Sequence, residues 1–157
     1  YNNLCDWVGI LYNMTLEDIF ELWSKDCDID RTELGEESLK IAQLHAKYFK
    51  IFSTERLSLR KLQSDLKVLK KYKYEWFAGS LDYDDMNELG WEPNPLKILR
   101  ADIPQYIDAD KDIIELTLKI SYQNEKVDFL EQAIRSLNSR GFNIKSAVEW
   151  EKFKVGI

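Results

Sequence analysis

The fold of this protein depends most on residues 34–76, which read LGEESLKIAQLHAKYFKIFSTERLSLRKLQSDLKVLKKYKYEW. Apart from Gly35, no Gly or Pro interrupts the chain between Thr32 and Gly79, so a single long helix is expected. Along it, mostly apolar residues recur at alternating steps of three and four, which is heptad spacing. These positions, called the seam below, are Leu34, Ser38, Ile41, His45, Tyr48, Phe52, Glu55, Leu59, Leu62, Leu66, Leu69, Lys73 and Trp76.

A helix of this length extends about 60 Å at about 1.5 Å per residue. A small domain cannot cover such a seam with one short element, so the seam must meet another helix or another subunit. In the first half, additional apolar residues widen the stripe, and we expect this half to be buried. These residues are Leu44, Phe49, Ile51 and Leu57. In the second half the stripe narrows to a line of leucines beside Lys and Arg, and we expect this half to be partly exposed.

The predicted fold class is mainly α, because the chain is poor in Gly and Pro and its apolar residues keep helical spacing. We predict an N-terminal extension at residues 1–13 and an N-terminal helical region at residues 14–79, which contains a short helix and the long central helix. Residues 80–107 form an acidic connector that contains Gly and Pro. Residues 108–157 form a C-terminal helical region that is expected to mediate oligomerisation of the helical protomers.

Capping residues predict the ends of the individual helices. Thr15 begins the short N-terminal helix, and Thr32 caps the long one. Asp108 begins a third helix, and Gly141 ends it as a C′ glycine. Asn143 then caps a last amphipathic helix, which is expected to dock on a partner subunit. Its predicted interface residues are Phe142, Ile144, Val148, Trp150 and Phe153.

Charge is distributed unevenly along the chain. Residues 47–73 hold nine Lys and Arg against two carboxylates, whereas the whole chain has a net charge of −6. A run of this kind is typical of a solvated helix face or of a surface that binds a polyanion. Acids that would neutralise a merely soluble helix are scarce here, and aromatic residues interleave with the cations, which favours single-stranded nucleic acid. The candidate nucleic-acid-binding residues are Arg60, Lys61, Lys67, Lys70, Lys71 and Lys73.

No catalytic, metal or cofactor motif is found in the sequence, and we do not predict an enzyme. Asp108, Asp110 and Asp112 copy the first ligands of a calcium loop, but Ile113 and Lys119 replace its glycine and its closing glutamate. Two cysteines are too few for a disulfide framework, and reduced thiols are expected. No apolar run approaches the roughly 18 residues of a membrane span.

Several segments together resemble the UvsY family of phage recombination mediators. They are Met14-Thr15-Leu16-Glu17-Asp18-Ile19, Ile29-Asp30 with Thr32 and Leu34, Leu44 with Lys47-Tyr48, Lys71-x-Lys73 before Trp76-Phe77-x-Gly79, Ala109-Asp110-Lys111-Asp112, and Ser139-Arg140-Gly141-Phe142 with Ile144-Lys145. The similarity runs from Met14 to the end of the chain. Residues 1–13 lie ahead of the position where the family begins.

The resemblance implies a non-enzymatic factor in the recombination, repair and replication of bacteriophage DNA. Members of the family form hexameric or heptameric rings and bind single-stranded DNA. They help to displace the phage single-strand DNA-binding protein and load a RecA-like recombinase, in the cytoplasm of the bacterial host. The basic pair that contacts DNA in the family corresponds to Lys71 and Lys73, where Lys73 replaces an arginine.

This chain departs from the family pattern after Gly79. The connector is longer and more acidic than expected, and Ser80 stands where a basic residue is expected, so weaker or more salt-sensitive DNA binding is predicted. Two other classes of function fit parts of the sequence. A coiled-coil structural or adaptor protein without DNA binding explains the seam, and a metal-dependent nucleotide hydrolase explains the clustered Asp residues less well.

Overall fold

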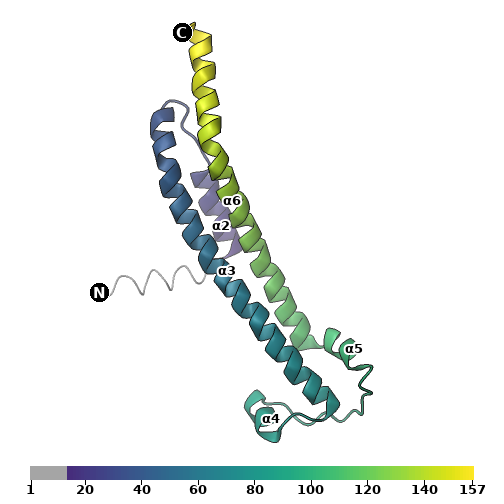
Figure 1. Ribbon diagram of the computed structural model, residues 1–157. Helices are drawn as coiled ribbons and strands as arrows, with labels where there is room; N and C mark the ends of the chain where they lie inside the picture. The colour runs from purple at the N-terminus through teal and green to yellow at the C-terminus, as the bar shows by residue number, and fades with distance from the viewer. Residues whose placement is uncertain (1–13) are drawn as a thin grey trace, which may run out of the picture. The chain divides into compact units, whose positions relative to one another are not determined.

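The computed structural model describes residues 14–157, which form five helices and no strand (Figure 1). The predicted extension at residues 1–13 lies outside the described residues. The mainly α fold with a long central helix is confirmed. The helices are α2 (Leu16–Asp26), α3 (Leu34–Ala78), α4 (Tyr83–Leu89), α5 (Ile103–Asp108) and α6 (Lys111–Val155).

The chain divides into two compact units. Of the described residues, unit 1 contains 14–57 and 123–157, and unit 2 contains residues 58–122. Both long helices, α3 and α6, contribute to each unit. No helix within residues 14–157 is long and apolar enough to cross a membrane.

α2 begins where the sequence predicts, at a capping box. The Thr15 hydroxyl accepts a hydrogen bond from the Asp18 backbone N–H at 3.1 Å, and the Asp18 carboxylate accepts one from the Thr15 N–H at 2.9 Å. These bonds lower the pKa of Asp18. Inside unit 1, Ile19 is fully buried and the ring of Phe20 meets Phe129 of α6 edge-on at 4.6 Å. α2 therefore packs against the long helices through its apolar side.

The predicted cap of α3 at Thr32 is wrong. α3 begins at Leu34, and the backbone N–H and hydroxyl of Thr32 both donate to the Asp30 carboxylate, at 2.8 and 2.6 Å. Asp30 thus holds Thr32 in the loop before the helix, as short polar side chains commonly do in turns.

The predicted break at Gly141 is also wrong, because α6 continues through it to Val155 and Gly141 does not have a positive φ. Arg140 and Ile144, which lie one residue before and three residues after Gly141 on α6, are both buried in unit 1. A Cβ on Gly141 would lie 3.7 Å from the Cδ1 atom of Ile41 on α3. Packing against α3 therefore holds the helix together where local propensity favours an end. Asn143 lies within the helix and caps nothing.

In unit 1 the seam of α3 packs against α6, but the wider stripe predicted for its first half is partly wrong. Tyr48, Ile51 and Phe52 are buried, whereas Phe49 and Leu57 are exposed. The seam also contains a buried carboxylate, which α6 neutralises. Glu55 accepts from the Nζ of Lys126 at 2.8 Å and from the Nε2 of Gln123 at 2.6 Å. Glu55 therefore has one charged donor, Lys126, and one neutral donor, Gln123, on α6.

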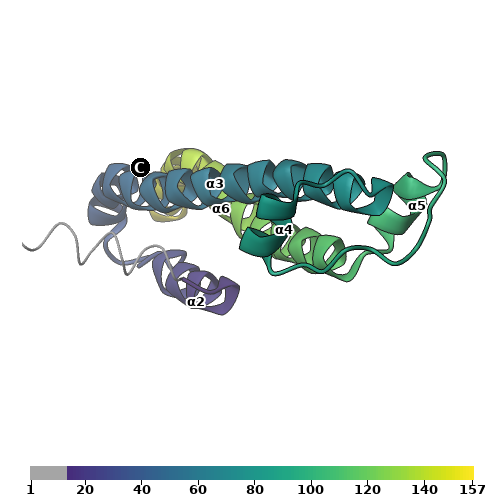
Figure 2. The ribbon, with the colours of Figure 1, turned by 90° about the horizontal axis from the view of Figure 1, so that it is seen from below.

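In unit 2 the segment predicted as a connector supplies part of the core. Ile103 and Ile107 of α5 are buried with Phe77 of α3 and Ile113 of α6. Figures 1 and 2 show α5 beside the end of α3 and the start of α6. The partly buried leucines of the second half of the seam, Leu66 and Leu69, pack against this cluster. The predicted partial exposure of that half is confirmed.

Candidate nucleic-acid interface

The exposed side of α3 in unit 2 carries cations in a helical register. Arg60, Lys67 and Lys71 are exposed and are separated by seven and four residues, so they share one face of the helix. Ser64 lies on that face between Arg60 and Lys67, and Tyr74 lies on it after Lys71. These five residues, called the basic stripe, extend about 21 Å along the helix. The seam lies on the other side of α3, so the stripe faces away from the core of unit 2.

The structure places the other two exposed cations differently. Lys70 is three residues after Lys67 and four before Tyr74, so it borders the basic stripe. Lys61 is one residue from Arg60, about 100° around the helix, and lies four residues before Asp65. Lys70 therefore borders the stripe beside Lys67 and Tyr74, and Lys61, three residues before Ser64, borders its other edge.

The cations of the stripe are only weakly neutralised by the protein. Lys71 is 3.7 Å from the Glu75 carboxylate, and its side chain remains 71% exposed. An exposed pair at this distance contributes little. Within residues 14–157, Arg60, Lys67 and Lys70 form no ion pair. Their charge is therefore directed at solvent, where a phosphate can approach.

The structure separates Lys73 from these cations. Lys73 is only 6% exposed, and its Nζ donates to Asp112 at 2.7 Å and lies 3.0 Å from the Asp110 carboxylate. The Nζ also lies over the ring of Trp91, 4.3 Å from its centroid. A cation held by two carboxylates and an aromatic ring binds α3 to the rest of unit 2. The heptad register carried this signal, because Lys73 occupies a seam position.

Asp110 has a second role, as the N-cap of α6. Its carboxylate accepts hydrogen bonds from the backbone N–H groups of Asp112 and Ile113, at 3.0 and 3.2 Å. The carboxylates at the start of α6 thus cap the helix and neutralise Lys73. Within the described residues, no group of three or more His, Cys, Asp and Glu is suited to a metal ion.

Of the five predicted oligomer-interface residues, the structure leaves three exposed. Phe142, Trp150 and Phe153 are 74%, 59% and 73% exposed, and the rings of Trp150 and Phe153 stack at 5.6 Å. Val148 is half-buried, and Ile144 is buried within unit 1. Ile144 is therefore not available to a partner subunit.

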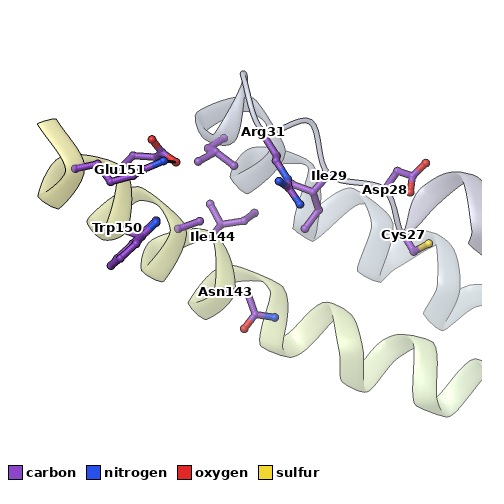
Figure 3. Close-up of a pocket in the computed structure, with 11 residues that line it drawn as sticks. Cys27, Asp28, Ile29, Arg31, Asn143, Ile144, Trp150 and Glu151 are labelled. Atoms are coloured by element: carbon purple, nitrogen blue, oxygen red, sulfur yellow. Dashed lines mark ion pairs between the residues drawn. The ribbon is translucent and has the colours of Figure 1, made fainter.

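A pocket of about 660 Å³ lies in unit 1, between the loop after α2 and the last turns of α6 (Figure 3). Ile29 and Arg31 line it from the loop, and Ile144 and Trp150 line it from α6. Its walls combine apolar side chains with charges of both signs. The free thiol of Cys27 also lines it, but no His lies beside that thiol to form a catalytic pair.

Sequence reasoning missed the residue that holds α2 in place. The guanidinium of Arg140, buried on α6, donates to the backbone carbonyls of Asp26 and Cys27 at 2.9 and 2.8 Å. It thereby satisfies carbonyls at the C-terminal end of α2. Arg140 lies in a segment that resembles the family, but nothing local indicates this role, because its partners are more than 100 residues away in the sequence.

Asp26 forms a second link between α2 and α3. Its carboxylate accepts hydrogen bonds from the Nζ of Lys47 at 2.6 Å and from the hydroxyl of Tyr48 at 2.9 Å. Burial opposes ionisation of Asp26, but these hydrogen bonds outweigh it and lower its pKa. Burial raises the pKa of Tyr48, and the bond to Asp26 adds to the increase.

These features define an all-α protein with two long helices, an outward basic stripe and exposed aromatic residues near its C-terminus. A family model described as "Recombination, repair and ssDNA binding protein UvsY" matches residues 22–157. The recombination protein UvsY of Enterobacteria phage T4 is 27% identical over 143 residues, covering 91% of this chain and 99% of the relative.

Solved structures agree with this match. Two crystal structures of the bacteriophage T4 recombination mediator protein UvsY, in lattice types II and IV, have TM-scores of 0.79 and 0.78. They are 26% and 27% identical in sequence, and the alignments cover 91% and 89% of this chain and 99% of each T4 chain. The chain belongs to the UvsY family, as the resemblance of its motifs predicts.

Proposed function

We propose that this protein is a recombination mediator that binds single-stranded DNA as a homo-oligomer. In this role it loads a RecA-like phage recombinase and displaces the phage single-strand DNA-binding protein, in the cytoplasm of the infected host. The observation that supports the proposal is the basic stripe on α3, whose cations are exposed and almost unpaired.

Binding to the stripe depends on phosphates and not on base sequence. Cations along one helix face contact the backbone of a strand, and such contacts carry no sequence information. They release condensed counterions, so affinity falls with salt. Repetition of the stripe in an oligomer adds avidity, because a strand bound to one copy has a high effective concentration at the next. A strand ordered over several copies is a suitable track for a recombinase.

The salt dependence can be estimated from the exposed cations. If Arg60, Lys67, Lys70 and Lys71 each contact one phosphate, the plot of log affinity against log salt has a slope of about −2.8 per protomer. Between 50 and 200 mM salt, the affinity per protomer then falls by about 50-fold. Several protomers on one strand make the dependence steeper.

The test combines Lys67→Ala with Lys71→Ala and measures binding to labelled oligo-dT by fluorescence anisotropy over a range of salt. Loss of two phosphate contacts lowers the slope per protomer by about 1.4 and weakens binding at low salt. The control is Lys97→Ala with Lys119→Ala, which removes the same charge from exposed sites outside α3. An equal loss in both variants would reject the stripe as the binding face. If the protein forms oligomers but does not bind oligo-dT even at low salt, the result would favour a coiled-coil adaptor without DNA binding.

Loading of a recombinase is tested in the same variants. A RecA-like recombinase hydrolyses ATP on single-stranded DNA, and a coat of single-strand DNA-binding protein inhibits it. The wild-type protein is expected to relieve this inhibition, and the variant with altered Lys67 and Lys71 is expected to relieve it less. If the wild type and the variant relieve the inhibition equally, recombinase loading does not depend on the basic stripe.

The oligomer is proposed to form through the exposed aromatic residues at the end of α6. Phe142, Trp150 and Phe153 expose large apolar surfaces close together in the sequence, as residues of a subunit interface do in an isolated protomer. Trp150→Ser combined with Phe153→Ser is expected to lower the mass measured by light scattering, while buried Ile144 is kept. The control is Leu118→Ser, at an exposed apolar site of unit 2. An unchanged mass would exclude these aromatic residues from the interface.

A further inference from the structure

One aromatic residue lies on the basic stripe itself. Of the four aromatic residues at residues 72–77, Trp76 and Phe77 belong to the core cluster of unit 2 or pack against it, and Tyr72 is half-buried. Tyr74 is 41% exposed. Within residues 14–157 its ring contacts no other aromatic ring, and its exposure leaves part of the side chain open to solvent.

The position of Tyr74 suits contact with a base of a strand whose phosphates are held by the stripe. Tyr74 lies three residues after Lys71 and four after Lys70, so all three are neighbours on one helix face. Cβ atoms at these spacings are about 5–6 Å apart. A phosphate bound by either lysine therefore brings the attached nucleotide close to the tyrosine ring.

The backbone that carries Tyr74 is anchored on both sides. Lys73, the preceding residue, is held by Asp110 and Asp112. Two residues after Tyr74, the indole N–H of Trp76 donates to the backbone carbonyl of Glu92 at 2.7 Å. A ring on an anchored helix loses little further freedom when a base stacks on it, which favours binding.

We propose that Tyr74 is a stacking platform for a nucleobase of the bound single strand. This inference rests on the proposed DNA binding and adds a base contact to it. Stacking on tyrosine tolerates any sequence, because every base has a π face, so the contact is compatible with non-specific binding. The contact excludes duplex DNA, whose bases are stacked on each other. Tyr74 thus gives the stripe a preference for unpaired strands that its cations alone do not have.

The experiment compares two ligands of equal length, oligo-dT and an oligonucleotide of abasic sites, which keeps the phosphates but has no bases. The variants are Tyr74→Ala and Tyr74→Phe. The control is Tyr83→Ala, which removes a more exposed tyrosine ring from α4, outside the stripe. Circular dichroism of each variant checks that the helices are retained.

Tyr74→Ala is expected to weaken binding of oligo-dT by at least about fivefold, with an unchanged salt slope and unchanged binding of the abasic strand. Tyr74→Phe is expected to bind like the wild type, because it keeps the ring. Equal loss on both ligands, or no loss on oligo-dT, would overturn the stacking role. Wild-type protein that binds neither ligand would instead reject the proposed function, whereas strong wild-type binding with no effect of Tyr74→Ala would reject only the stacking.

Discussion

Substitution of Lys73 by Met tests whether this residue belongs to the core of unit 2 or to the proposed DNA-binding face. Met keeps an unbranched apolar side chain but removes the ammonium group that Asp110 and Asp112 hold at 3.0 and 2.7 Å. Removal of one partner from a buried ion pair costs about 3–5 kcal/mol, because the remaining charge is buried without compensation. Here Asp112 is half exposed and can be solvated, so we expect the lower end, about 3 kcal/mol.

For a chain of this size, a loss of about 3 kcal/mol lowers the melting temperature by about 6–12 °C. Differential scanning calorimetry at fixed protomer concentration measures it, since oligomers melt in a concentration-dependent way. The matched control is Lys71→Met, two residues away and exposed, for which the change in the free energy of unfolding should stay within about 0.5 kcal/mol.

The two substitutions should also differ in DNA binding. Lys71→Met is expected to weaken binding of oligo-dT and to lower its salt slope without a change in melting temperature. A Lys73→Met variant that melts like the wild type but loses DNA binding would refute the structural role. It would place Lys73 in contact with the strand, as the resemblance to the family implies.

Two further substitutions test other features of the fold. Gly141→Ala is expected to stabilise the protein by about 1 kcal/mol in calorimetry, because the glycine lies inside a helix and the added Cβ meets Ile41 at an ordinary 3.7 Å; destabilisation would mean that the position needs glycine. Hydrogen bonds from Lys47 and Tyr48 outweigh burial and lower the pKa of Asp26, so its contribution is present above the ordinary pKa of about 3.9 and lost as pH falls below it. Between pH 5 and pH 3, the free energy of unfolding measured in urea should therefore fall less for Asp26→Asn than for the wild type. An identical fall in both proteins would contradict the lowered pKa of Asp26.

The sequence predicted the parts of the fold that depend on local periodicity. The seam located α3 and showed which side of it is buried, and the capping box at Thr15 located the start of α2. The same register would have placed Lys73 in the core. The charge run and the family motif instead favour the DNA-binding face, and neither contains information about burial.

Features that depend on distant partners could not be predicted. Glu55 and Lys73 occupy apolar seam positions, and their compensating charges come from α6 and the segment before it, about 40 to 70 residues later. The end expected at Gly141 did not occur because contact with α3 outweighs the low helix propensity of glycine. α5 was missed because its helix is short and is stabilised by burial of Ile103 and Ile107 more than by local signals.

The Asp110 carboxylate contributes to the stability of two helix ends, the start of α6 and the end of α3. It fixes the first turn of α6 and, through Lys73, the last turns of α3. We expect fraying at one of these helix ends to weaken the other, because both ends depend on the same carboxylate. We therefore expect the basic stripe, which lies on the same helix, to keep its geometry for as long as this shared contact is intact.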